Sequence, residues 1–587
     1  MQITWYSFRE KVLPVLKIVL AMIWLANLAH TEAYFSIYIL IAFFSFYVSV
    51  KKPETGTPGR GGKQLVWILS GLFSLAVLLA NYPLFTLVRD SARIGSSTNR
   101  MLNAVNTVFS LFGGYYVAKP ILHWFFGRFP QSCHSWKKEK GERFLPTFFF
   151  LSIAAVHLLH LFLVEYPGNV TEDSFTQISE MVAGQYSNFN TFWHTMLFQG
   201  ILRLGYGLFG DINAAVTLFC VFQILVLAFA FTYCLMTLYR YGVPKGLLVA
   251  AYLIYAILPY NLALSITIWK DVLFGAGILL AISAAFRILE EISPKSWKAY
   301  GVFVLGSLLM ILSRTNGWIL ALVFALSYGL FLRKNKAFLA ASVTVALAGW
   351  VLLNPMLSIL HIPGLDKVES LSVPIQQVSR VVSEGCALTQ EEEALLSQVV
   401  DLQTVPQRYV NWLSDPMKVA LRDTNPGYLE AHLGDYARLW LHLGLRYPAQ
   451  YLKAWVDQTK GYWNAGYPYA MYSETVTENP YGVAKASNAN PIASLYGIYA
   501  GLSRHIILFE PLHSIGLQVW LLILCFFMSL ARKRQAAMLC VPLISIVVGL
   551  WFGSPVYCCF RYVYPLFISM PLIFATAVYC GKETQSK

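Results

Sequence analysis

Long runs of apolar residues dominate the chain and determine the architecture that it predicts. Most runs are roughly 18–25 residues long, enough for a helix to cross a bilayer core of about 30 Å. They predict an all-α polytopic membrane protein with about fourteen transmembrane helices, near residues 12–30, 33–50, 65–86, 103–126, 145–165, 212–238, 246–264, 271–289, 299–313, 316–332, 337–359, 511–531, 537–553 and 562–580. A water-soluble protein would have to bury all of these all-round-apolar helices in one core, which argues against that class.

Basic residues are concentrated in short loops beside every second apolar run. These loops are Lys51 to Lys63, Arg128 to Arg143, Arg240 to Lys245, Arg333 to Lys336 and Arg532 to Arg534. The connections between them, such as 166–190, are nearly free of Lys and Arg. Because short cytoplasmic loops of membrane proteins are enriched in Lys and Arg, we expect a multi-pass protein of the cell membrane with both termini in the cytoplasm.

Composition and charge agree with this topology. Hydrophobic residues make up 57% of the chain and charged residues 13%, about half the charged fraction of an ordinary globular domain. The net charge of +14 arises mainly beside the predicted helices. We therefore interpret it as an orientation signal, and we predict the lipid bilayer as a partner and no nucleic acid.

The order of apolar and hydrophilic segments divides the chain into four regions. Residues 1–130 form an N-terminal region of four membrane helices, and residues 131–360 form a transmembrane core that contains a long outer loop at 166–211. Residues 361–505 are hydrophilic and long enough to bury a core of their own, so we predict a mostly helical extracytoplasmic domain. Residues 506–587 add three membrane helices and a cytoplasmic tail.

Three cysteines are predicted on the outer face: Cys386, Cys558 and Cys559. A disulfide from Cys386 to one member of the adjacent pair is compatible with this placement. Spacing alone does not fix connectivity, so the pairing stays open.

The most informative chemistry lies in the outer loop that follows the fifth predicted helix. Pro167-Gly168 ends the helix where it leaves the bilayer, and two adjacent carboxylates follow at Glu172 and Asp173. A carboxylate at the membrane surface can act as a general base toward a hydroxyl or can ligate a divalent cation beside a phosphate. Alternatively, Asp173 caps a helix that begins at Ser174.

Four further polar side chains are predicted at the outer ends of helices: Lys270, Asp271, Arg314 and Arg561. Arginine on the outer face runs against the charge bias, so each needs a partner, either a lipid-linked phosphate or a neighbouring acidic side chain. Asp271 and Lys270 have a simpler interpretation as a helix N-cap and a headgroup contact. His194 either lines the same site or is an interfacial histidine.

This arrangement resembles the GT-C superfamily of membrane glycosyltransferases, over residues 145–580. In that superfamily an acidic residue lies in the first large outer loop, another lies in the next outer loop, and a soluble domain follows near the end. Glu172-Asp173 and Asp271 match the two acidic positions. A second set of motifs resembles an uncharacterised bacterial family of multi-pass membrane proteins grouped with those transferases, namely Pro167-Gly168, Asp173-Ser174, Gln177 and Val373-Pro374-Ile375-Gln376-Gln377.

One departure from the superfamily is clear. Four predicted helices precede the loop that carries the acidic motif, whereas in the simplest members the loop follows the first helix.

The resemblance implies transfer of a sugar from a polyprenyl-phosphate donor to an acceptor on the outer face, either a surface glycan, a wall polymer or a protein. Asp173 would deprotonate the acceptor hydroxyl, and Glu172 and His194 would assist.

The resemblance also implies how the charge of the donor is handled. Lys270, Arg314 and Arg561 would neutralise the phosphate as it becomes the leaving group. Asp173 and Asp271 could hold a divalent cation, Mg²⁺ or Mn²⁺, as the one cofactor.

Two other classes fit a polytopic protein. A transporter or flippase of lipid-linked precursors predicts ionisable residues at mid-bilayer, broken helices and symmetric halves. A non-catalytic scaffold for envelope assembly predicts that Asp173 is dispensable. Charges at the outer interface and one large ectodomain favour the transferase.

Overall fold

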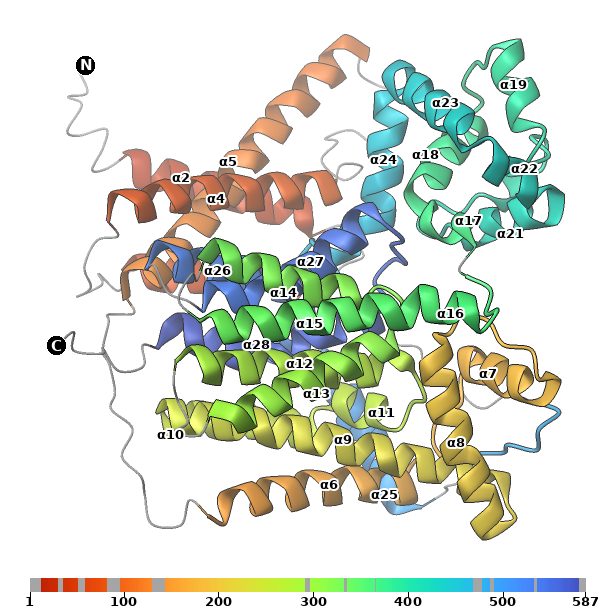
Figure 1. Cartoon of the computed structure of the whole chain (residues 1–587). Coiled ribbons are helices and arrows are strands. Elements are labelled where there is room, and N and C mark those ends of the chain that lie inside the picture. Colours follow the sequence, from red (N-terminus) through yellow and green to blue (C-terminus); the bar gives the residue numbers. More distant parts are fainter. Residues whose placement is uncertain are drawn as a thin grey trace.

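The computed structural model (Figure 1) describes residues 12–29, 35–50, 59–81, 96–128, 143–290, 296–331, 335–364, 366–467, 478–485, 490–532 and 536–579. Within these ranges the structure is helical, and its only β-type pairings are two isolated bridges. Both termini and most of the basic loops named above lie outside the described residues.

Each of the fourteen predicted apolar segments contains a helix. The observed helices are α2 Leu13–Leu28, α3 Phe35–Val50, α4 Arg60–Ala80, α5 Ser96–Arg128, α6 Leu145–Leu163, α9 Ile212–Tyr241, α10 Lys245–Ile257 with α11 Pro259–Ser265, α12 Lys270–Leu289, α13 Ser296–Ser313, α14 Gly317–Phe331, α15 Lys336–Leu353 with α16 Pro355–Ile359, α26 Ile515–Ala531, α27 Ala537–Phe552 and α28 Phe560–Val578.

Among the described helices, six are long and apolar enough to cross a membrane, or seven if the bent pair α10 and α11 is one span. Six more apolar helices are shorter. The helical membrane class predicted from the sequence is therefore confirmed, and the count of fourteen spans stays a prediction.

Helix α12 lies in the middle of the bundle, between α9, α13 and α28 (Figure 1). Its side chains are buried from Asp271 to Ile288. It packs against α13 where two glycines meet, because a Cβ added to Gly277 would lie 2.6 Å from the carbonyl oxygen of Gly306. Small residues at such a crossing let two helices approach closely, which is how membrane helices gain packing energy.

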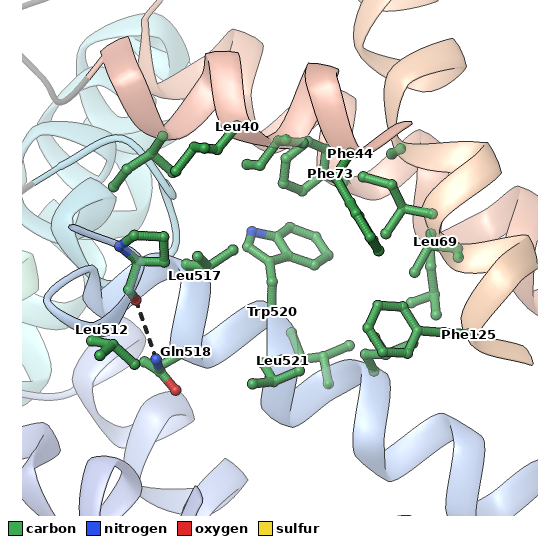
Figure 2. Close-up of a pocket in the computed structure, with 18 residues that line it drawn as sticks. Leu40, Phe44, Leu69, Phe73, Phe125, Leu512, Leu517, Gln518, Trp520 and Leu521 are labelled. Carbon is green, nitrogen blue, oxygen red and sulfur yellow. Dashed lines mark hydrogen bonds between the residues drawn. The ribbon is translucent and has the colours of Figure 1, made fainter. Parts of the chain in front are cut away.

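The N-terminal helices α2 to α5 form a group that meets the rest of the bundle mainly at α26. Phe73 packs edge-on against Trp520 with ring centroids 5.3 Å apart, and the Tyr38 hydroxyl donates to the side-chain oxygen of Asn464. Beside this contact lies a cavity of about 420 Å³ (Figure 2), with the Trp520 indole at its centre. Its one polar side chain, Gln518, donates to the carbonyl oxygen of Pro511, so the cavity offers no chemistry beyond apolar contact.

A lobe of shorter helices lies at one end of the bundle (upper right in Figure 1). It comprises α17 Lys367–Ser370, α18 Ser372–Ser383, α19 Gln390–Leu396, α20 Val405–Arg408, α21 Asp415–Thr424, α22 Pro426–Ala431 and α23 Leu433–Arg446. The lobe has apolar clusters of its own around Val368 and Val381. Helix α24, Pro448–Thr459, leads from the lobe back to the bundle, and Asp457 on it pairs with Arg380 of the lobe at 2.7 Å.

The last helix of the predicted 361–505 domain, α25 Pro491–His505, lies against the bundle beside α6. Asn490 donates to the carbonyl oxygen of Leu163, and the Tyr499 hydroxyl donates to the carbonyl oxygen of Ile257. The lobe itself therefore comprises fewer residues than the hydrophilic segment from which it was predicted.

We expect the Gly277→Ala variant to be destabilised by about 1–3 kcal/mol, because the added methyl group forces α12 and α13 apart. Thermal unfolding in detergent would measure the loss. The matched control is Gly301→Ala on α13, where a Cβ meets nothing within 4 Å. Equal melting temperatures for the two variants would contradict a close crossing at Gly277.

Candidate functional site

Two loops that are far apart in sequence are joined by backbone hydrogen bonds at the lobe end of the bundle. The amide of Asn169 donates to the carbonyl oxygen of Ile266 at 2.9 Å, and the amide of Ile268 donates to the carbonyl oxygen of Asn169 at 3.0 Å. The hydroxyl of Ser174 adds a third bond, to the carbonyl oxygen of Ile268 at 2.7 Å. These bonds place the start of α7, Glu172–Ala183, beside the start of α12.

Gly168 allows the loop after α6 to approach the loop that precedes α12. Its φ of +116° lies in the region that L side chains rarely adopt, and a Cβ here would collide with the sulfur of Cys220. The Cys220 thiol in turn donates to the carbonyl oxygen of Ile266. The Pro167-Gly168 break that the sequence predicts therefore also closes the junction between the loops.

Neither aspartate caps its helix. Thr171 is the N-cap of α7, where it and Ser174 form a reciprocal capping pair, and Trp269 is the N-cap of α12. Asp173 and Asp271 both lie in the first turn, where the positive end of the helix dipole favours a carboxylate. The N-cap interpretations of the two residues are wrong, and their side chains are available for other partners.

Those partners are two arginines from further helices. Arg561, in the first turn of α28, lies 2.6 Å from Asp173 Oδ2. Arg314, in the turn between α13 and α14, lies 3.0 Å from Asp271 Oδ1. The Nε of Arg561 also lies 3.9 Å from Asp271 Oδ2, so one guanidinium lies near both carboxylates.

Aromatic rings hold the guanidinium groups in place. Arg561 lies 5.0 Å from the ring centroid of Trp269 and 5.1 Å from that of Tyr562. Arg314 lies 4.9 Å from the ring centroid of Tyr562 as well. A cation at this range from a ring face is attracted by the π electrons, so the rings stabilise the charges without neutralising them.

Lys270 is the third cation of the site. Its ammonium group donates to the carbonyl oxygen of Phe189 and to the side-chain oxygen of Asn190, both at 3.0 Å. The amide nitrogen of Asn190 donates to the carbonyl oxygen of Asp173 at 3.1 Å. Asn190 therefore ties α12 to α7, and the charged cluster consists of Asp173, Asp271, Lys270, Arg314 and Arg561.

The environment of Asp173 favours its charged form. Partial burial by itself would raise the pKa of this carboxyl group, but the positive charges of Arg561 and Lys270 outweigh burial and lower the pKa below the ordinary value. Asp173 is therefore a carboxylate at neutral pH, and it stays one while Arg561 remains beside it.

Asp271 is the most buried member of the cluster, with an exposed fraction of 1%. Neither of its oxygens accepts a hydrogen bond of good geometry, so its stabilisation comes from the charges of the arginines. A buried carboxylate that depends on ion pairs is costly to retain and is disrupted when one partner is removed.

His194 lies behind α7, on α8, Phe192–Phe209. Its ring is buried against Phe219, and its Nδ1 accepts a hydrogen bond from the side-chain nitrogen of Gln177. Burial lowers the pKa of His194 to about 3, so the imidazole is neutral. This geometry gives His194 a positioning role for α7 through Gln177, and neither nitrogen of its ring hydrogen-bonds to a member of the charged cluster.

Glu172 is exposed on the first turn of α7, beside Asp173. Among the described residues, no group of three or more His, Cys, Asp or Glu side chains gathers in a way that could hold a metal ion. The two aspartates expected to share a cation, Asp173 and Asp271, are each paired with arginine.

The three cysteines that the sequence predicts on the outer face are free thiols, so the disulfide that the sequence permits is not formed. Cys386 packs in the apolar cluster of the lobe around Val381. Cys558 packs against Gly461, next to the bundle, and Cys559 is buried beside it. The separate packing of the lobe and the bundle explains why the cysteines do not meet.

Three residues of the site were not identified from the sequence: Asn190, Trp269 and Tyr562. Asn190 is in the polar and aromatic segment that ends at His194, and its neighbour Thr191 has a φ of +62°. A strained non-glycine residue of this kind is typical of functional segments. Trp269 precedes Lys270 and Tyr562 follows Arg561 in the sequence. This adjacency to predicted site residues is the sequence feature that could have identified them.

We expect Asp271→Asn to lower the free energy of unfolding by about 3–5 kcal/mol, because it breaks an ion pair whose carboxylate is buried and leaves the partly buried Arg314 without its partner. Denaturant or thermal unfolding in detergent would measure the loss. The control is Asp423→Asn in the lobe, where the carboxylate is 65% exposed and lies 4.0 Å from Arg408. A control loss as large as that of Asp271→Asn would contradict a special role for the buried pair.

Asp173 should make stability depend on pH in a defined direction. Its pKa in the folded state lies below the ordinary value of 3.8, so the ion pair contributes fully above that value and its contribution is lost as the pH falls through the folded-state pKa. We expect Asp173→Asn to be less stable than wild type by about 1–2 kcal/mol at neutral pH, between the values for exposed and buried pairs.

The difference in melting temperature between wild type and Asp173→Asn, followed from neutral to acidic pH, would test this expectation. It should be constant down to about pH 5 and should shrink below about pH 4. A difference that grows on acidification would show that Arg561 does not stabilise the carboxylate.

The comparisons with known proteins give a family without a function. No curated protein and no solved structure matches the sequence. Residues 182–587, more than half of the chain, match a family model described as a family of unknown function, DUF6020. The match includes α12, α28 and the lobe, and it leaves out the four N-terminal membrane helices and Asp173. The chain therefore belongs to the DUF6020 family.

Proposed function

We propose that this protein is a membrane glycosyltransferase of GT-C type, with the fourteen-span arrangement predicted from the sequence. It would move a sugar from a polyprenyl-phosphate donor to an acceptor outside the cell membrane. One observation carries the proposal. Two carboxylates and three cations, contributed by α7, α12, the α13–α14 turn and α28, lie together at the end of an apolar bundle, beneath a polar lobe.

The charged cluster could support a reaction in which a phosphate is displaced from a sugar. The acceptor oxygen would form a bond to the anomeric carbon of the sugar while the bond from that carbon to the phosphate oxygen breaks. The acceptor proton would pass to the carboxylate of Asp173. The polyprenyl phosphate would leave with its negative charge next to Arg314, Arg561 and Lys270, which are held in place before the reaction begins.

Donor binding would also activate the base. While Arg561 is paired with Asp173, it lowers the pKa of that carboxyl group and makes it a weak base. A donor phosphate that accepts hydrogen bonds from Arg561 would take the guanidinium away from Asp173, because Arg binds phosphate oxygens in a forked geometry. The pKa of Asp173 would then rise, and proton transfer would become possible only with the donor in place.

A divalent cation could enter this proposal only by exchange with an arginine. Asp173 and Asp271 are the carboxylates that would ligate Mg²⁺ or Mn²⁺, and both are paired with guanidinium groups. We therefore assign neutralisation of the phosphate to Arg314, Arg561 and Lys270.

One feature favours a transporter as the second candidate. Helices α10 and α11 are bent by 45° at Leu258, and broken helices often form substrate sites in transporters. In this protein the break has a different use, because α11 leads directly into the 264–269 segment that pairs with Asn169. The charged cluster also lies at the end of the bundle, whereas transporters bind their substrates near mid-bilayer.

Replacing Asp173 by Asn in the organism that carries this chain tests the proposal. Surface and wall glycans would be compared by mass spectrometry among wild type, a deletion strain and the variant. We expect the variant to lose the same glycan signal as the deletion strain, to about 1% of wild type or less, because removal of a general base costs about 10²–10⁴-fold in rate. Asp423→Asn, with its exposed carboxylate on the lobe, should retain the wild-type signal.

The competing classes predict other results. Full rescue of the deletion by Asp173→Asn, with normal amounts of protein in the membrane, would favour a scaffold. In a transporter mutant, the lipid-linked sugar would accumulate where an impermeant oxidant such as periodate cannot reach it from outside. In a transferase mutant it would accumulate within reach of that oxidant. Unchanged glycans in the deletion strain would overturn the transferase proposal.

A further inference from the structure

A second gathering of positive charge lies at the other end of the bundle, on the N-terminal helices. Helices α2, α3 and α5 surround a cavity of about 580 Å³. Lys17 of α2 and Lys119 and His123 of α5 line it. The rest of the lining consists mostly of apolar and aromatic side chains, with two serines.

These lysines have no acidic partner among the residues that the structure describes. The ammonium group of Lys17 lies 5.5 Å from the ring centroid of Tyr116, and that of Lys119 lies 5.3 Å from Tyr115 and 5.6 Å from Trp67. Both side chains are half-buried. The rings hold the ammonium groups without neutralising them, so the cavity keeps its positive charge.

The cavity lies near the ends of three N-terminal helices, where a bilayer around the predicted spans would present its headgroups. It lies at the start of α2, the end of α3 and the last third of α5, at the end of the bundle away from the lobe (left in Figure 1). Its rim is apolar and exposed, since Ile18 is 52% and Phe46 is 59% exposed. Long basic side chains above exposed apolar surface are typical of the boundary between hydrocarbon and headgroups.

We propose that this cavity binds one anionic phospholipid, with the lipid phosphate between Lys17 and Lys119 and the acyl chains on the apolar rim. Basic pockets between membrane helices recognise anionic headgroups through this combination of charge and apolar surface. The exposed Ile18 and Phe46 favour a lipid over a free phosphate ion, because they offer contact area only to a ligand that has chains.

This site is independent of the proposed transferase chemistry. It involves none of the residues of the charged cluster, and it lies in the part of the chain that precedes the DUF6020 match at residue 182. A bound lipid would bridge α2, α3 and α5, so it would stabilise the packing of the N-terminal helices.

Native mass spectrometry of the full-length protein in detergent tests the proposal. The protein would be titrated with phosphatidylglycerol, phosphatidylcholine and, separately, glycerol phosphate. We expect one phosphatidylglycerol to be retained in preference to phosphatidylcholine, and glycerol phosphate not to compete. The double variant Lys17→Gln with Lys119→Gln should bind phosphatidylglycerol about 25-fold more weakly, at about 5-fold per lysine near an anionic lipid.

Two matched variants keep the test decisive. Lys298→Gln removes an exposed lysine that lies over Trp297, outside the cavity, and should leave binding unchanged. Replacing both Lys17 and Lys119 by Arg keeps the charge and should keep lipid retention, which separates loss of charge from loss of fold. Equal retention of both phospholipids, competition by glycerol phosphate, or unchanged binding in the double Gln variant would each overturn the proposal.

Discussion

The site depends on charges that neutralise one another at the boundary of an apolar bundle. Ionised groups are costly at such a position unless they are paired. Arg561 lies beside Asp173 and near Asp271, and Arg314 completes the set on the other side of Asp271. Four separate segments of the chain therefore come together to pair these charges. The two carboxylates offset the two arginines and leave the charge of Lys270, which donates to a carbonyl oxygen and an amide oxygen. An anion that binds an arginine must therefore replace a carboxylate as its partner.

Two local features of the backbone bring the segments of the charged cluster together. Gly168, in a conformation that requires glycine, lets the loop after α6 approach the segment between α11 and α12. The bend between α10 and α11 supplies the other half of the contact by directing the 264–269 segment toward Asn169. A helix break that would suggest a transport pathway elsewhere serves here to deliver Lys270 and Asp271 to the site.

The basic side chains at the two ends of the molecule have different kinds of partner. At the lobe end, every arginine of the cluster lies beside a carboxylate. At the far end, Lys17 and Lys119 are held by aromatic rings and keep their positive charge. Arginines that are paired with carboxylates can exchange partners with a substrate, whereas lysines without an acidic partner attract an anion and keep it. This contrast is why we assign chemistry to the first and lipid binding to the second.

The sequence by itself determined the helical membrane class, the positions of the apolar helices and the residues that carry charge at helix ends. Run length and charge alternation are local properties, and the bilayer imposes them on each segment separately. Tertiary structure alone decided how those charges pair. The sequence left open whether Arg314 and Arg561 would meet a phosphate or an acidic side chain, and packing placed each beside an aspartate. It also placed His194 behind α7 and left Cys386 and Cys558 unpaired, because these relations depend on contacts between segments that are distant along the chain.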